Sequence, residues 1–196
     1  MILSHRFTEA LVYATELHAT QIRKGSKVPY ISHLLGVASI ALEYGADEDE
    51  AIAALLHDAI EDQGGPPIRT EIRLRFGERV TEIVDGCTDT DITPKPPWEE
   101  RKKAYINRIA SASASVRLVS AADKLHNIRS ILKDYRMQGD LLWDLFKGGK
   151  QGTLWYYRSL VTAFHEADST PIVMELDRLV TELERLVQTE RREVPF

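Results

Sequence analysis

The sequence predicts an all-α protein that forms a single domain over residues 1–196, and three observations support this prediction. Apolar residues recur about every 3.6 positions along most of the chain, as on one face of an α-helix. The one run that could form a strand, residues 116–119, has no evident partner strand. A length of 196 residues corresponds to roughly one domain, at about 150 residues per domain.

Local signals place the individual helices. Ser4 is a suitable N-cap for the first helix, and the residues 23–25, Arg-Lys-Gly, favour its end. The acidic residues 47–50 favour the start of another helix, because carboxylates interact well with the positive end of the helix dipole. Glycine and proline at 64–67 break the chain. The predicted helices span about 7–22, 32–44, 47–62, 68–76, 77–87, 98–111, 115–136, 150–167 and 172–192, with irregular loops at 88–97 and 137–149.

Composition and charge exclude several classes of protein. Apolar residues make up 43% and charged residues 28%, which is typical of a folded globular chain and not of a disordered one. The formal net charge of −5 makes the chain a poor non-specific binder of nucleic acid. No stretch reaches the ~18 consecutive apolar residues of a membrane span, and the N-terminus lacks a signal-peptide layout. With the single cysteine Cys87 no intrachain disulfide can form, so we expect a cytoplasmic protein.

The segment 53–62 places polar residues inside an apolar helical pattern. His57 and Asp58 interrupt a run of Ala, Leu and Ile, although charged side chains are rarely buried unless they are paired or bind a metal. Glu61 and Asp62 follow one helical turn later on the same face. Three carboxylates so close together repel one another unless a cation neutralises them. The alternative interpretation is a solvated helix end beside an ordinary core histidine.

Two further segments add residues of the same kind. His33 opens the second predicted helix, and Asp123 interrupts the apolar run 118–122. Together with His57 and Asp58 they would form a set of nitrogen and oxygen ligands. Such a set suits Mn²⁺, Fe²⁺ or Zn²⁺, and a six-coordinate ion held by these ligands keeps positions for water and a phosphate oxygen. The residues therefore predict a hydrolytic metal site.

These segments also resemble a known family. The order of His33, the His57–Asp58 pair and Asp123 resembles the HD-domain metal-dependent phosphohydrolases. More narrowly, the sequences H-A-T-Q-I-R-K with P-Y-I-S-H, A-L-L-H-D-A-I-E-D and A-D-K-L-H-N-I-R-S resemble the hydrolase domain of RelA/SpoT-type alarmone enzymes. The resemblance covers about residues 5–160, and at 196 residues the chain is similar to the small stand-alone alarmone hydrolases. It implies an HD-type helical bundle.

The resemblance further implies an activity and a cofactor. The small alarmone hydrolases remove the 3′-pyrophosphate of (p)ppGpp, giving GDP or GTP and pyrophosphate, typically with Mn²⁺. Glu61 and Asp62 would then orient the attacking water and move its proton. The residues expected to bind the nucleotide are Arg23, Lys24, Asn127, Ser130 and Tyr156.

Two alternative functions fit the same residues. One is an HD phosphohydrolase for another nucleotide such as NADPH, from which it would release orthophosphate. The other is a non-catalytic domain that binds a nucleotide or a partner, although such a domain need not keep both Glu61 and Asp62.

Several positions depart from the family pattern or stand beside it. Leu34 and Gln63 occupy positions where the family commonly has Pro and Thr, and the segment 148–158 is more aromatic than its counterpart in the long enzymes. None of these differences removes an expected ligand. His126 is expected to point away from the face shared by Asp123 and Asn127, and to be a structural histidine, and His18 is expected to be a packing or surface residue.

Overall fold

The computed structural model describes residues 2–190 and confirms the all-α prediction. Within these residues no β-strand forms, and an isolated antiparallel bridge joins Ile22 to Pro29. The elements are α1 His5–Leu17, α2 Ile31–Glu43, α3 Glu48–Leu56, α4 Ala59–Gln63, α5 Pro66–Phe76, α6 Glu78–Cys87, α7 Trp98–Ile109, α8 Ala114–Gln138, the 3₁₀ helix η1 Gly139–Leu145, α9 Gly149–Ala167 and α10 Pro171–Glu190.

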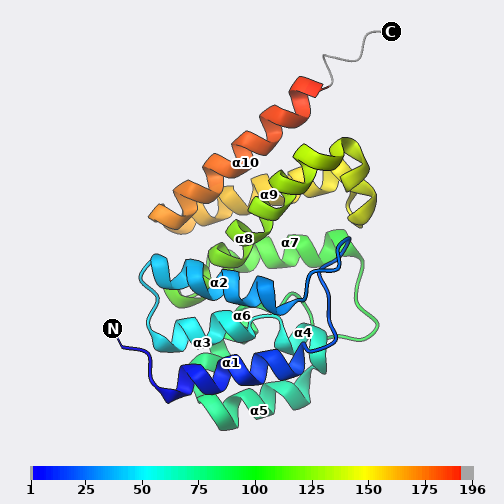
Figure 1. The fold of residues 1–196 in the computed structure, drawn as a ribbon. Helices are drawn as coiled ribbons and strands as arrows, with labels where there is room; N and C mark the ends of the chain where they lie inside the picture. Colours follow the sequence, from blue (N-terminus) through cyan, green and yellow to red (C-terminus); the bar gives the residue numbers. More distant parts are fainter. Residues whose placement is uncertain (1, 191–196) are drawn as a thin grey trace.

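The long helix α8 occupies the centre of the molecule (Figure 1). It packs against α2, α3 and α6 and also against α10, so its side chains are buried in more than one direction. Helices α1 and α5 lie at the edge opposite α10, and α7 packs against α9 (Figure 1). A polar residue in the middle of α8 is therefore enclosed by helices from distant parts of the chain.

The first helix is shorter than its apolar pattern predicts. It ends at Leu17, and Ile22 is 56% exposed, so this residue does not extend the buried stripe. The chain instead folds back on itself: Arg23 N–H donates to Val28 O and Tyr30 N–H to Gln21 O. The resulting loop between α1 and α2 carries both predicted basic residues of the site.

The third helix is not continuous over 47–62 as predicted. A capping box formed by Asp47 and Glu50 starts α3, in agreement with the acidic signal. The helix then breaks, because the ring Nδ1 of His57 is 2.8 Å from Ala54 O, the carbonyl that a continuous helix would pair with the Asp58 N–H. Helix α4 starts directly afterwards. The break turns His57 and Asp58 into the junction between two helices.

Other boundaries differ in smaller ways. Pro66 and Pro67 do not end a helix but begin α5, where the missing N–H groups cost nothing. The predicted loop 137–149 is largely the end of α8 and the helix η1. The predicted end of the last helix at 192 lies outside the described residues. None of the helices within residues 2–190 has the length and apolar character required to span a bilayer.

Candidate metal centre

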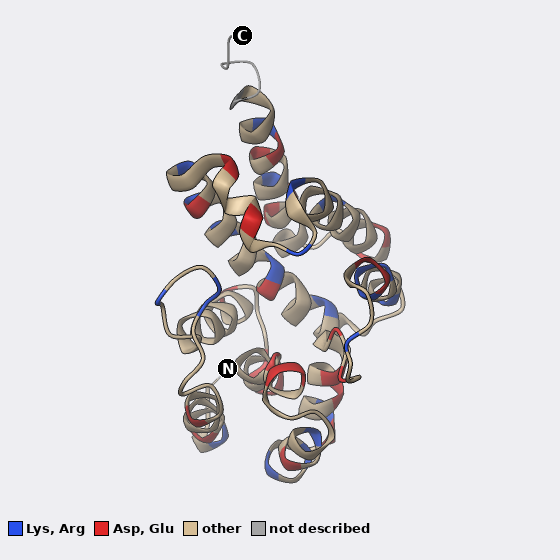
Figure 2. Ribbon diagram, turned by 90° about the vertical axis from the view of Figure 1, so that its right-hand side faces the viewer, with Lys and Arg blue, Asp and Glu red and all other residues tan. Residues whose placement is uncertain are grey.

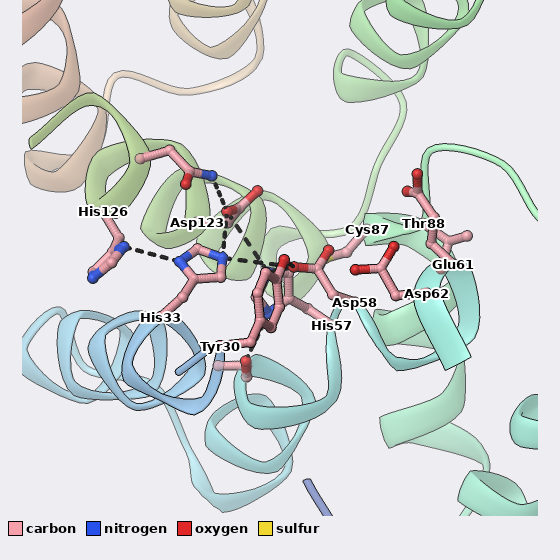
Figure 3. A network of polar contacts seen from close by, with 12 residues as sticks. Tyr30, His33, His57, Asp58, Glu61, Asp62, Cys87, Thr88, Asp123 and His126 are labelled. Carbon is pink, nitrogen blue, oxygen red and sulfur yellow. Dashed lines mark hydrogen bonds and ion pairs between the residues drawn. The ribbon is translucent and has the colours of Figure 1, made fainter. Parts of the chain in front are cut away.

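The four predicted ligand residues meet at one point in the interior (Figure 3). His33 comes from α2, His57 and Asp58 from the α3–α4 junction, and Asp123 from α8. His33 Nε2 lies 3.3 Å from Asp123 Oδ1 and 3.6 Å from Asp58 Oδ2. His57 Nε2 lies 3.0 Å from Asp58 Oδ2 and 3.6 Å from Asp123 Oδ1. The structure thus brings together segments that are far apart in the sequence.

Each ligand side chain is held by a second contact. His57 Nδ1 donates to Ala54 O, so the Nε2 atom of the ring faces the cluster. The Tyr30 hydroxyl donates to Asp58 Oδ2 at 2.6 Å. Asn127 Nδ2 donates to Asp123 Oδ1 at 2.5 Å. These contacts orient the donor atoms toward a common centre.

His126 contacts the remaining predicted ligand, His33, and its position corrects a prediction from the sequence. It does not point away from the site, because its Nδ1 lies 2.9 Å from His33 Nδ1 (Figure 3). Burial and the neighbouring His33 ring lower the pKa of His126 to about 4, so the ring is neutral. His126 therefore has the structural role that was expected of it, but that role is to orient His33.

The donor set fits a divalent cation. Burial acts to raise the pKa of Asp58, but the adjacent His57 outweighs it, so the pKa lies well below its usual range. Burial likewise opposes ionisation of Asp123, and the Lys124 ammonium in contact with it keeps its pKa well below its usual range. His57 Nε2 is buried and makes no hydrogen bond of good geometry within the described residues. The two imidazole rings with Asp58 form one cluster, and Asp123 lies beside both rings. Nitrogen and carboxylate oxygen donors of this kind match the preferences of a divalent transition metal.

The two predicted catalytic acids point in different directions (Figure 3). Asp62 points from α4 toward Asp58, and burial followed by the charge of Asp58 raises its pKa to about 6. Glu61 instead accepts from the Asp89 N–H at 3.2 Å and from Lys95 Nζ at 2.8 Å, both on the loop after α6. Glu61 and Asp62 are neighbours within α4, and successive residues of a helix project about 100° apart, so they do not face the same partners.

A cavity of about 740 Å³ lies next to this cluster. Its lining includes all five residues predicted to contact the nucleotide, and Tyr156 is almost completely buried. Arg23 Nη2 donates to Asn127 Oδ1 at 2.8 Å, and its guanidinium lies 5.8 Å from the centre of the Tyr30 ring. Figure 2 views the side of the molecule on which the α1–α2 loop lies and shows basic residues on that loop.

The cavity also contains residues that the sequence did not single out. Lys102 of α7 lies 4.9 Å above the Tyr156 ring and pairs with Asp89 at 3.0 Å. Trp98, on the preceding turn, packs so closely against Gly148 that a Cβ there would lie 2.7 Å from its ring. No motif marks either residue, because both stand among ordinary polar residues of a helix. Their roles depend on how α7 packs against α9.

Comparisons with known proteins agree with this geometry. The model of the HD domain family matches residues 10–152. The guanosine-3′,5′-bis(diphosphate) 3′-pyrophosphohydrolase MESH1 of Xenopus tropicalis is 42% identical over 126 residues, which are 63% of this chain and 68% of the relative. The protein of the same name from Homo sapiens is 36% identical over 126 residues, with the same shares of 63% and 68%.

Solved structures match over most of the chain. A structure described as a metazoan orthologue of SpoT that hydrolyses ppGpp and plays a role in starvation responses has a TM-score of 0.77 at 26% identity. The match covers 93% of this chain and 98% of that one. A protein of Listeria monocytogenes has a TM-score of 0.71 at 29% identity, covering 78% of this chain and 99% of the other.

Proposed function

The chain belongs to the HD-domain family, and on this premise we propose that it is a divalent-cation-dependent hydrolase that removes the 3′-pyrophosphate of ppGpp and pppGpp. Water adds to the phosphorus bonded to the 3′ oxygen, the bond between these two atoms breaks, and GDP or GTP leaves together with pyrophosphate. The observation that carries the proposal is the cluster of His33, His57 and Asp58, with Asp123 beside both histidines, next to a cavity lined with cations. The similarity to MESH1 supports the choice of substrate.

The charge of the cavity suits a polyanionic nucleotide. Its lining contains a single acidic residue within the described part of the chain, Asp134, against a larger set of cations. Because the whole molecule carries a formal net charge of −5, the attraction for phosphate must come from this local set. A volume of about 740 Å³ lies within the usual range for small-molecule sites. The cations are Arg23, Lys24, Lys102, Lys133 and Lys147.

The ligands we assign to the cation are His33, His57, Asp58 and Asp123. We assign Mn²⁺ as the native ion, with Fe²⁺ and Zn²⁺ as the other ions that this donor set suits. When bound, a divalent cation lowers the pKa of a coordinated water and polarises a phosphoryl oxygen.

The side chains around the cluster have separate tasks in this proposal. Asp62, whose carboxylate faces Asp58, takes the proton of the attacking water. Glu61 fixes the loop that follows α6 through Asp89 and Lys95, and so closes this side of the site. Arg23 binds the nucleotide by stacking on it or by a bidentate hydrogen bond to it. Asn127 accepts a hydrogen bond from the Arg23 guanidinium and holds it in place.

Two further assignments concern the domain organisation and the cellular location of the protein. We propose that residues 1–196 form one domain, and in its described part α9 and α10, largely beyond the matched residues 10–152, pack on η1 and α8. We propose that the protein acts in the cytoplasm on a small-molecule substrate.

Product analysis tests the proposed function. The Mn²⁺-loaded protein is incubated separately with ppGpp, pppGpp, NADPH and simple nucleoside phosphates, and the products are resolved by ion-exchange chromatography. We expect pyrophosphate and GDP or GTP from the first two, at rates well above any release of orthophosphate from the others. If NADPH is turned over faster than ppGpp, the alarmone assignment is wrong, although the hydrolase assignment survives.

A further inference from the structure

Three polar side chains lie behind Asp62, and none of them belongs to the lining of the nucleotide cavity. Gln21, on the α1–α2 loop, donates from Nε2 to Asp62 Oδ2 at 2.8 Å. The Gln21 Oε1 atom lies 2.6 Å from His18 Nδ1 and 2.6 Å from Gln63 Nε2. Gln63 directly follows Asp62, so the arrangement links the end of α1 to the end of α4.

The Asp62 carboxylate determines which way the Gln21 amide points, because an ionised carboxylate can only accept and so requires the NH₂ group. Burial lowers the pKa of His18, so its ring is neutral and carries one proton. The 2.6 Å contact requires that proton on Nδ1, because two lone pairs at this distance would repel each other. Gln63 supplies a second donor to the same oxygen. The Gln21 oxygen is therefore held toward His18 and Gln63.

This orientation leaves the Gln21 NH₂ group facing Asp62. The reverse amide orientation would place an oxygen against the ionised Asp62 carboxylate, which has no proton to donate, so the hydrogen bond between these two side chains would be lost. The donor arrangement thus holds the Asp62 carboxylate through one of its two oxygens. The second oxygen is left for the reaction.

We propose that Gln21 is a positioning residue that fixes the Asp62 carboxylate for proton transfer, with its own amide oxygen held in place by His18 and Gln63. This inference rests on the proposed function, in which Asp62 accepts the proton of the attacking water. Gln63 stands where the resembling family commonly has Thr, a shorter side chain with no amide. The Gln21–Gln63 contact is therefore a feature of this chain's own sequence.

Gln21 offers a selective substitution. Its backbone oxygen accepts from Tyr30 N–H at 2.9 Å, and a change of side chain does not remove that bond or the loop that carries Arg23. His18 is less suitable, because its ring also stacks on Tyr30 at 5.2 Å. Gln21→Met keeps the length of the side chain and removes both the donor and the acceptor. Gln188→Met, at an exposed position on α10, is the matched control.

The kinetic test compares single and double variants with ppGpp and Mn²⁺. We expect Gln21→Met to lower kcat about tenfold or more, with KM within about twofold of the wild type and unchanged manganese content. Gln63→Met should lower kcat in the same direction but less, and Gln188→Met should not. The double variant Gln21→Met/Asp62→Asn should be no slower than Asp62→Asn alone, because Gln21 acts only through that carboxylate.

A second readout does not depend on activity. The side-chain NH₂ signals of Gln21, identified in a ¹⁵N-labelled protein by their loss in Gln21→Met, should shift in Asp62→Asn and in Gln63→Met and stay in place in Gln188→Met. The inference would be overturned if the Gln21 NH₂ signals do not shift in Asp62→Asn. It would also be overturned if the fold-losses of kcat in Gln21→Met and Asp62→Asn multiply in the double variant. If Asp62→Asn is slow but Gln21→Met and Gln63→Met both keep full kcat, the positioning role is wrong and the proposed function stands. If Asp62→Asn itself keeps full kcat, the proposed role of Asp62 is wrong.

Discussion

Two imidazole rings of the candidate metal centre are oriented by different kinds of partner. His57 uses a backbone carbonyl of its own helix, whereas His33 depends on His126 from α8. The second contact needs close approach of α2 and α8, and Gly36 provides it. A Cβ at Gly36 would lie 2.3 Å from the His126 ring. The geometry of one ligand therefore depends on a glycine one turn further along the same helix.

Gly36→Ala tests this dependence. Alanine normally favours a helix interior over glycine by about 0.5–1 kcal/mol, but here the added methyl group must displace His126. We expect a lower affinity for Mn²⁺, measured by isothermal titration calorimetry, together with a lower melting temperature. The double variant Gly36→Ala/His126→Ala should recover the melting temperature without recovering the affinity. Wild-type affinity in Gly36→Ala would contradict the assigned role of His126.

The contact between Arg23 and Asn127 leads to a prediction about substrate binding. Arg23→Ala should raise KM for ppGpp by about tenfold or more and leave the manganese content unchanged, because Arg23 is not a ligand. Arg23→Lys should recover little, since an ammonium group cannot form a planar fork or stack in the same way. Steady-state kinetics check the result, and a loss confined to kcat would instead place Arg23 at the scissile phosphate.

At the scale of the element, the start of α3 was predictable and its end was not. The acids 47–50 start the helix as expected, and two of them, Asp47 and Glu50, form a capping box, because capping is local in sequence. The break at His57 depends on a hydrogen bond from the His57 ring to the Ala54 carbonyl of its own helix. The spacing of apolar residues does not reveal this contact. The α1–α2 loop escaped prediction for a similar reason, since Ile22 fits the helical pattern but lies on the surface.

The cap of α3 gives a prediction about stability and pH. Asp47→Ala should cost about 1 kcal/mol of unfolding free energy, the usual loss for an N-cap. The contact with Arg79 lowers the pKa of Asp47, so its contribution is present above the unfolded pKa and is lost as the pH falls through the folded one. Urea melts of wild type and variant should differ at pH 7, and the difference should shrink as the pH falls below the usual pKa range of an Asp carboxyl. Asp144→Ala, at an exposed position on η1, serves as the control, and a difference that stays equal as the pH falls would contradict the prediction.

At the scale of the whole molecule, the candidate site joins three parts of the bundle. Its candidate ligands come from α2, the α3–α4 junction and α8, and α10 also packs against α8. That these four side chains lie close together was predictable, because charged residues interrupt apolar runs, which is a local signal, and their role as ligands stays a prediction. The positions of Lys102 and Trp98 were not, since they follow from the contact between α7 and α9.

Because the candidate ligands come from three parts of the bundle, we expect the folding stability to depend on the bound metal. A cation that binds only the folded state at a hundredfold excess over its Kd adds about 2.7 kcal/mol to the unfolding free energy. Exhaustive chelation should lower the melting temperature measured by calorimetry, and Mn²⁺ should restore it. Calcium at the same concentration, an ion that prefers oxygen ligands, should restore it much less. A melting temperature that changes neither with the chelator nor with Mn²⁺ would contradict the assignment of a metal site.

The most direct test of the account measures metal content and ppGpp turnover on the same samples of two variants four residues apart. Asp58→Ala removes an assigned ligand, whereas Asp62→Asn removes the assigned proton acceptor and leaves the ligands in place. We predict that Asp58→Ala loses both bound manganese and pyrophosphate release. Asp62→Asn should retain manganese and lose at least about 10²-fold in rate, the usual scale for a general base. Full pyrophosphate release by either variant, or by wild-type protein shown to be free of metal, would contradict the account.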